Sequence, residues 1–337
     1  MKRILFSILM LGMLTQSQAQ GLHFSQYNNA PMLLNPANTG LLQDNDWRAG
    51  VQYRNQWSTV AVPYNTFAVY GDCGLFRNQW ETSWLGTGLG IWRDVAGTGN
   101  LALTKVQANL AYHVLLNDNS SLSAGLGAAY NQRSVDFDKL TYDVQWDEFS
   151  FNKNISNNES FNKARSSFMD LSLGMNFAYY NNTNFYMKVS VGARNLNQPS
   201  ETFYGSSNRL GLRPLANLDI TYKASNSFII NPSIYYTTQK RASELVAGAM
   251  FNINVGENRV SGNNEFLIGA YYRLQDAAIF ATGYQFRQHR VTFSYDHTVS
   301  QMSAGNKGIG AFELSLILQG TYKPGNYIVN TYGCPRF

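Results

Sequence analysis

The chain has 337 residues, a formal net charge of +5 and only 14% charged residues. This length suits one large domain, and the charged fraction is low for a soluble protein. Removing Lys2 and Arg3 would lower the charge from +5 to +3, and no basic cluster with interleaved aromatic residues occurs. Composition therefore argues against nucleic acid as a partner. The 21 Tyr, 20 Phe and 6 Trp residues would instead suit the two interfaces of a membrane.

The first nineteen residues read as a secretory signal peptide. Lys2 and Arg3 precede an apolar run over 4–14, and Ser17-Gln18-Ala19 supplies small residues at a cleavage site. The mature chain would then begin near Gln20, outside the cytoplasm. No later stretch reaches the ~18 apolar residues that a membrane-spanning helix needs.

Residues 20–46 form the next segment, and they do not alternate between apolar and polar positions. The stretch Asn35-Pro36-Ala37-Asn38 indicates turns, so irregular structure is predicted here. Two placements remain open: an ordered periplasmic segment, or a small plug inside the barrel that the rest of the chain predicts.

From Trp47 almost to the C-terminus, apolar residues alternate with polar or small ones. Met187, Val189 and Val191, for example, interleave with Lys188 and Ser190. Period two is typical of strands, whose successive side chains point to opposite faces. Strands of about ten residues with one apolar face are what a membrane-spanning β-barrel requires. Residues 47–337 therefore predict an all-β, antiparallel outer-membrane barrel with a C-terminal tail, and a soluble secreted β-sandwich is the alternative.

Fourteen strands are predicted, at 47–54, 65–72, 84–94, 102–114, 121–133, 166–180, 184–194, 215–224, 228–238, 243–255, 264–275, 277–287, 289–299 and 310–322. An even number places both ends of the barrel sheet on one side, which would be the periplasm, together with both chain termini. Short turns on that side and long loops outside are expected, and the longest loop spans 134–165. Two connections break this rule: 256–263 is long for a periplasmic turn, and the turn near Asp276 is short for an external loop.

Two cysteines are predicted at the periplasmic rim. Cys73 follows the second strand and Cys334 follows the last, and these strands lie close together in a closed barrel. An oxidising periplasm permits a disulfide between them, with a stabilisation of about 2–4 kcal/mol if it is unstrained. Two unpaired thiols are the alternative.

The predicted lumen face collects more cations than anions. Alternation assigns to it Arg48, Arg54, Lys105, Arg133, Lys188, Arg194, Lys223, Arg273, Arg287 and Arg290, against Asp170, Asp219, Asp296 and Glu313. Such an excess inside a low-dielectric wall could focus an electric field on an acidic ligand. The alternative is a polar, hydrated lumen whose charges pair with one another.

No catalytic or cofactor-binding motif is present, and no metal or cofactor is expected. Gly86, Gly88 and Gly90 alternate with larger residues, which indicates a strand facing a crowded lumen rather than a phosphate loop. On the strand at 289–299, alternation points Ser294 and Asp296 inward and His297 outward, so a hydrolase site is disfavoured.

Two sequence blocks resemble the PorP/SprF family of type IX secretion system membrane proteins. The first includes Phe24-Ser25-Gln26-Tyr27, Leu34-Asn35-Pro36-Ala37 and Gly40, and continues through Arg48-Ala49-Gly50 and Tyr53-Arg54-Asn55-Gln56-Trp57. The second is Cys334-Pro335-Arg336-Phe337. Asn38-Thr39 departs from the aromatic or small residues that the family resemblance leads one to expect after Asn-Pro-Ala.

The resemblance implies a bacterium of the phylum Bacteroidota and an outer-membrane barrel that works with the secretion machinery. It further implies partners in the periplasmic or outer-membrane parts of that machinery. It also implies a role in exporting or retaining secreted substrates, including gliding adhesins, through their C-terminal sorting domains. Phe24, Ser25, Gln26, Tyr27, Asn35 and Pro36 would either dock a partner or hold a plug. A non-enzymatic substrate anchor is the function predicted, and a passive channel or transporter for small solutes is the alternative.

Overall fold

The computed structural model describes residues 22–42, 45–58, 63–77, 79–80, 82–147, 149–157, 164–181, 184–203, 208–255, 264–301 and 303–322. The predicted signal peptide and most of the C-terminal tail, with Cys334, lie outside these ranges. Among the described residues, no helix has the length and apolar character needed to cross a membrane.

Fourteen strands close into one antiparallel barrel, as predicted. They are β1 (Trp47–Gln56), β2 (Tyr64–Leu75), β3 (Ser83–Ala96), β4 (Leu101–Asn117), β5 (Ser120–Ser134), β8 (Arg165–Asn181), β9 (Phe185–Arg194), β10 (Arg213–Ser225), β11 (Phe228–Gln239), β12 (Ala242–Asn254), β13 (Asn264–Arg273), β14 (Ala277–Phe286), β15 (His289–Thr298) and β16 (Ile309–Gly320). Each strand pairs with its neighbours in the chain, and β1 closes the barrel on β16 with Trp47 opposite Gly320.

Alternation along each strand separates a lipid-type face from a polar interior. Leu89, Ile91 and Phe280 are exposed on the outer surface, whereas inward positions such as Gln52 and Asn176 are buried. A closed barrel leaves no unpaired strand edge, so the backbone groups of every strand are satisfied within the sheet. The outer belt is therefore apolar and the lumen polar, as a membrane barrel requires.

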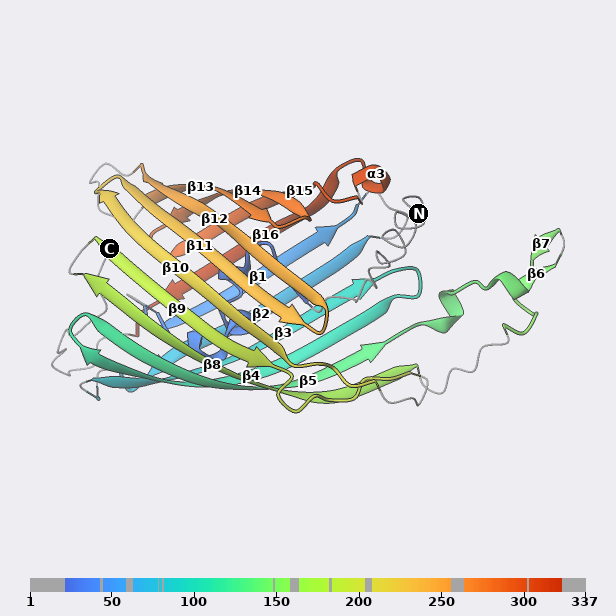
Figure 1. Ribbon diagram of the computed structural model, residues 1–337, viewed down its shortest axis with the longest axis horizontal. Helices are drawn as coiled ribbons and strands as arrows, with labels where there is room; N and C mark the ends of the chain where they lie inside the picture. The colour runs from blue at the N-terminus through green and yellow to red at the C-terminus, as the bar shows by residue number, and fades with distance from the viewer. Residues whose placement is uncertain are drawn as a thin grey trace, which may run out of the picture.

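The barrel has two rims that differ in their connections. The terminal rim, where β1 begins and β16 ends, carries tight turns such as the one between β4 and β5. The opposite or distal rim carries the long connection from β5 to β8, which contains η3 (Phe137–Lys139), η4 (Asp143–Gln145) and the small hairpin β6 (Trp146–Asp147) and β7 (Ser150–Phe151). Figure 1 shows this hairpin far beyond the barrel. The short helix α3 (Ser303–Asn306) precedes β16 at the same rim.

The two exceptional connections persist in the structure without changing the strand count. β12 and β13 are joined by a long connection at the terminal rim, and β13 and β14 by the tight turn around Asp276 at the distal rim. The asymmetry of loop lengths is thus a tendency of this barrel rather than a rule for every hairpin.

Candidate functional site

Residues 22–42, called the plug from here on, fill the middle of the lumen. They form three short helices, η1 (Tyr27–Asn29), α2 (Pro31–Leu34) and η2 (Pro36–Asn38). Helices this short are unstable alone, so the surrounding wall must hold them. Proline occupies the first position of α2 and of η2, where its fixed φ suits a helix start. Asn35 caps η2, because its side-chain oxygen accepts a hydrogen bond from the Ala37 N–H at 2.9 Å.

Ser25 and Gln26 attach the start of the plug to β15 and β16. The backbone N–H groups of both residues donate to the carboxylate of Glu313, at 2.5 and 2.9 Å. The Ser25 hydroxyl donates to Asp296 at 2.5 Å. The Gln26 amide donates to the Ser294 hydroxyl at 3.0 Å. A barrel residue therefore satisfies each of these plug groups.

A buried ion network lies beneath Ser25. Arg54 forms ion pairs with Glu313 and with Asp296, the latter at 3.2 Å, and all three side chains are about 2% exposed. Arg273 lies 3.4 Å from Asp296 and donates to the Ser25 hydroxyl at 2.6 Å. Charges so deeply buried are stable only when they are paired and hydrogen-bonded. The plug thus completes the coordination of charges carried by β1, β13, β15 and β16.

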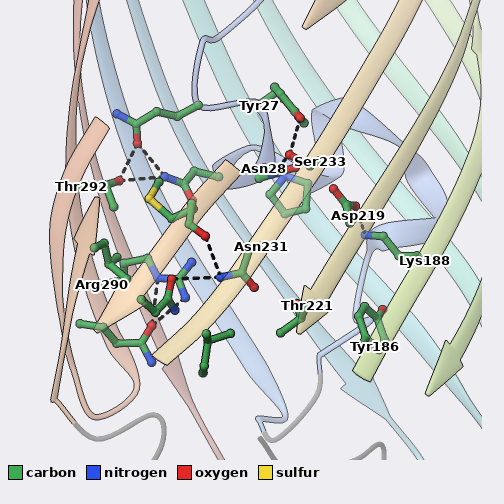
Figure 2. A pocket seen from close by; sticks show the side chains of 18 of the residues that line it. Tyr27, Asn28, Tyr186, Lys188, Asp219, Thr221, Asn231, Ser233, Arg290 and Thr292 are labelled. Carbon is green, nitrogen blue, oxygen red and sulfur yellow. Dashed lines mark hydrogen bonds and ion pairs between the residues drawn. The ribbon is translucent and has the colours of Figure 1, made fainter. Parts of the chain in front are cut away.

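Tyr27 anchors the plug on β11 and β13. Its ring stacks on Tyr235 with centroids 5.1 Å apart, and it meets the edge of Tyr271 at 6.4 Å. Its hydroxyl lies 2.7 Å from the Ser233 hydroxyl. Figure 2 marks this contact with a dashed line. Phe24 packs in a separate cluster that includes Tyr70. Phe24 and Tyr27 of the first family block are therefore buried lumen contacts.

Asn35 and Pro36 lie against strands that carry glycine. The Asn35 amide donates to the Val191 carbonyl at 3.1 Å, and this side chain is fully buried. A Cβ atom at Gly174 would lie 1.7 Å from the Asn35 side-chain oxygen, and one at Gly125 would lie 2.5 Å from the plug backbone. Glycine in β5 and β8 therefore creates the space for the Asn-Pro-Ala turn.

The end of the plug is held by β2, β3 and β4. A Cβ atom at Gly86 would lie 1.9 Å from the Thr39 carbonyl oxygen. His113 bonds to that same carbonyl at 2.9 Å. Asp72 accepts a hydrogen bond from the Gly40 N–H at 2.7 Å and pairs in a bidentate manner with Arg48. The glycine alternation of β3 is thus explained by close approach of the plug.

Two cavities flank the plug. The larger, about 870 Å³, lies toward the terminal rim, and Figure 2 shows Tyr27, Lys188, Asp219, Asn231 and Arg290 around it. The smaller, about 280 Å³, lies toward the distal rim and is lined by Leu22 and Leu33 from the plug. Leu22, the first described residue, therefore lies on the distal side. The even strand count places the start of β1 and the end of β16 at one rim, but it does not determine on which side of the plug the segment before β1 starts.

Most of the predicted lumen cations have carboxylate partners. The pairs are Arg48–Asp72 at 2.8 Å, Arg54 with Asp296 and Glu313, Lys105–Asp170 at 3.0 Å, Arg133–Glu201 at 2.6 Å, Lys188–Asp219 at 3.1 Å, and Arg273 with Glu244, Asp276 and Asp296. Arg290 instead donates two hydrogen bonds to the side-chain oxygen (Oε1) of Gln285. Within the described part of the chain, Arg194 has neither an ion pair nor a hydrogen bond from its Nε.

Sequence reasoning identified four of the carboxylates that neutralise these cations, namely Asp170, Asp219, Asp296 and Glu313, but missed three others. Asp72, Glu201 and Glu244 were not assigned to the lumen. Alternation from the inward Tyr70 would have found Asp72, and alternation from Val246 would have found Glu244. Glu201 lies in the connection after β9, where no alternation exists to reveal it.

The remaining candidate residues from the sequence are the two cysteines and the polar residues of β15. Cys73 lies near the end of β2, opposite Trp47 at the terminal rim, while pairing with Cys334 concerns a residue outside the described ranges. Ser294 and Asp296 face inward and bind the plug, whereas His297 is exposed on the other face. Among the described residues, no group of three or more His, Cys, Asp or Glu side chains could hold a metal ion.

Half-buried His23 makes attachment of the plug sensitive to acid. Burial, followed by the nearby guanidiniums of Arg54, Arg273 and Arg213, lowers the pKa of His23 from 6.5 to about 3. The attached plug therefore disfavours a proton that the released plug accepts near pH 6.5. Attachment contributed by neutral His23 is complete above pH 6.5 and is lost as the pH falls toward 3.

We expect the wild-type plug to lose roughly 1–2 kcal/mol of attachment between pH 7.5 and 5 through His23. A His23→Gln variant should lose less over the same interval. Limited proteolysis of the plug at the two pH values measures the difference. Equal acid sensitivity of the two proteins would contradict this assignment and leave the carboxylates as the only source of any pH effect.

Comparison with known proteins agrees with this architecture. The chain is similar to the monoaromatic hydrocarbon channel CymD (12% identity, 90% of this chain and 95% of that chain, TM-score 0.50). It is also similar to the toluene transporter TbuX of Ralstonia pickettii (10% identity, 86% of this chain and 92% of that chain, TM-score 0.51). A third similar structure is the toluene transporter TodX of P. putida (10% identity, 88% of this chain and 95% of that chain, TM-score 0.52). Identities this low establish the barrel fold alone. A comparison with curated proteins found no match.

The family model described as type IX secretion system membrane protein PorP/SprF matches residues 16–318. This range includes the plug and all but the last strand residues of the barrel. The apolar outer belt and closed sheet make the chain an integral outer-membrane barrel. It belongs to the PorP/SprF family of type IX secretion system membrane proteins.

Proposed function

We propose that this barrel is a non-enzymatic anchor of the type IX secretion system, which binds a secreted protein through its C-terminal sorting domain. In this proposal the terminal rim faces the periplasm and the distal rim faces outward. The binding surface is formed by the distal loops, and the plug keeps the barrel filled while they do so.

The observation that carries the proposal is the projecting distal hairpin. Around its tip, the apolar side chains of Val144, Trp146 and Phe149 are 50%, 60% and 90% exposed. Figure 1 shows the hairpin of β6 and β7 beyond the barrel wall. Exposed aromatic side chains on a loop are typical of protein–protein contact sites, where Trp and other aromatic residues often supply most of the binding energy.

The plug residues favour a structural role over partner docking. Tyr27 is 6% exposed and Asn35 is fully buried, so neither side chain is available to a periplasmic protein while the plug is in place. We therefore assign the parts of the first family block that lie in the plug, Phe24-Ser25-Gln26-Tyr27 and Leu34-Asn35-Pro36-Ala37, to plug attachment. Unchanged co-purifying partners after replacement of Tyr27 and Asn35 by alanine would support this assignment, and selective loss of one partner with the plug still protected would oppose it.

A hairpin variant tests the anchor function. We expect the Trp146→Ser/Phe149→Ser double variant to retain about a tenth or less of the co-purifying secreted protein, because truncation of an aromatic hot spot typically costs 2 kcal/mol or more. Barrel folding should not change, since neither side chain packs in the barrel. The matched control is Leu196→Ser, which removes another exposed apolar side chain from a distal loop. Full retention of the secreted protein by the double variant would contradict the proposal.

A small-solute channel is the second candidate. The cavity of about 870 Å³ favours it, since ligand pockets typically span ~300–1,000 Å³. The structural neighbours named as a channel and as transporters also favour it. Against it stands the plug, whose Met32, Ala37 and Thr39 are fully buried in mid-lumen. Ion conductance of the wild-type barrel with no partner present would favour the channel.

A further inference from the structure

The cavity on the distal side of the plug has a surplus of positive charge. Five cationic and three acidic residues line it, which leaves 5 − 3 = +2: Lys105, Arg133, Arg194, Arg213 and Lys240 against Asp170, Glu201 and Glu244. The cavity extends from Leu22 and Leu33 of the plug to Lys240 in the turn between β11 and β12. It therefore lies in the distal half of the barrel.

Each of the three carboxylates forms an ion pair with a cation other than Arg194. Asp170 pairs with Lys105 at 3.0 Å and accepts a second hydrogen bond from the Asn195 N–H at 2.8 Å. Glu201 pairs with Arg133 at 2.6 Å. The remaining acid, Glu244, pairs with both Arg213 and Arg273. No carboxylate in the described part of the chain is left for Arg194.

Arg194 and Arg213 lie directly opposite each other on β9 and β10. Like charges in such a cross-strand pair repel, because opposed Cβ atoms are only about 5 Å apart. Arg213 finds Glu244 at 3.7 Å, but Arg273 lies closer to that same carboxylate, at 3.3 Å. Arg194 is half-buried, and its Nε is buried without a hydrogen-bond partner among the described residues. Arg194 therefore lacks the anion that a buried guanidinium ordinarily requires, and Arg213 shares its carboxylate with Arg273.

The remainder of the cavity wall defines the chemistry of the missing anion. Leu22, Leu33, Leu103, Phe168 and Leu210 provide an apolar side, and Asn131 and Asn195 provide amides. A volume of about 280 Å³ is slightly below the usual range for small-molecule pockets. It suits a carboxylate on a short apolar chain, since guanidinium groups bind carboxylates in bidentate fashion.

We propose that Arg194 and Arg213 form a binding site for an organic carboxylate that carries a short apolar group. Two sources share this chemistry, a small free acid and the carboxyl-terminal residue of a polypeptide. The site is independent of the distal hairpin, so the inference does not rest on the proposed anchor function.

Calorimetric titration of the full-length barrel in a neutral detergent tests the proposal with two matched probe pairs. Hexanoate is compared with hexanamide, and N-acetyl-leucine with its amide. We expect each acid to bind at least about tenfold more tightly than its amide, because only the acid supplies the missing charge. Tighter binding of N-acetyl-leucine than of hexanoate would identify a polypeptide terminus as the source, and the reverse order a free acid.

Variants locate the binding at the arginine pair. Arg194→Gln should weaken hexanoate binding at least about tenfold, whereas Arg194→Lys should retain part of it. Lys139→Gln, in the distal connection away from the residues that line the cavity, should retain nearly all of it. Unliganded Arg194→Gln should unfold at the same temperature as wild type or higher, because the substitution removes a repulsion rather than an ion pair. Wild-type protein that binds neither acid better than its amide, or Arg194→Gln that binds hexanoate like wild type, would overturn the proposal.

Discussion

Replacement of Gly86 by valine is expected to displace the plug and open the lumen. A Cβ atom at this position would lie 1.9 Å from the carbonyl oxygen of Thr39, a backbone atom that no side-chain rotation can move. The same substitution leaves the β3 backbone free to pair with β2 and β4, since residue 86 faces the lumen. The barrel should therefore fold while the end of the plug loses its place.

The expected effect is large because a fourteen-stranded barrel lies between the filled small barrels and the open porins in width. We expect ion conductance in planar bilayers to rise more than about tenfold over wild type. Proteolysis should also cleave the plug in folded Gly86→Val protein. The control is Gly305→Val, where a Cβ atom would meet nothing within 4 Å. Wild-type conductance of Gly86→Val, with its plug still protected, would refute this account of β3.

Replacement of Arg54 by methionine is expected to destabilise the barrel strongly. The change keeps a similar chain length but leaves Glu313 without its close partner and weakens the support of Asp296, both about 2% exposed. Breaking one side of a buried ion pair costs about 3–5 kcal/mol, because the remaining charge is left uncompensated. The Ser25 hydroxyl also loses a donor at 2.7 Å, so attachment of the plug weakens at the same time.

Thermal unfolding in detergent measures this effect, with Lys139→Met as the matched control. Lys139 forms an exposed ion pair with Asp136 at 3.5 Å in the distal connection. Such surface pairs contribute about 0–1 kcal/mol, so the control should unfold close to wild type. Equal unfolding temperatures for Arg54→Met and Lys139→Met would show that the network beneath Ser25 contributes little.

The barrel could be predicted from sequence because its strands carry a local signal. Alternation over ten or more residues is visible without any partner strand, and predicted segments such as 264–275 differ from the structure only at their ends. Inward positions follow from the same period, and Arg54, Lys105 and Arg273, which it assigns to the lumen face, are buried in the structure. No pattern in the sequence indicates on which side of the plug Leu22 lies.

Pairing inside the lumen could not be predicted, because it depends on register and on closure of the barrel. Arg54 meets Glu313 only because β1 and β16 pair with these two residues directly opposite. Ser25 reaches Asp296 across 271 residues of chain. The plug contacts strands that are far apart in the sequence, such as β4, β11 and β15. No short stretch of sequence indicates these contacts. Alternation along the strands therefore indicates an excess of cations in the lumen, whereas most of these cations form ion pairs with carboxylates in the folded barrel.

The most direct test of the proposed function is purification of the tagged protein from its native host in a mild detergent, with co-purifying proteins identified by mass spectrometry. The proposal predicts recovery of a secreted protein attached through its C-terminal sorting domain, together with components of the secretion machinery. It also predicts that the Trp146→Ser/Phe149→Ser variant loses the secreted protein. A barrel that purifies alone, and that conducts ions in a bilayer with its plug in place, would contradict the anchor function and favour a channel.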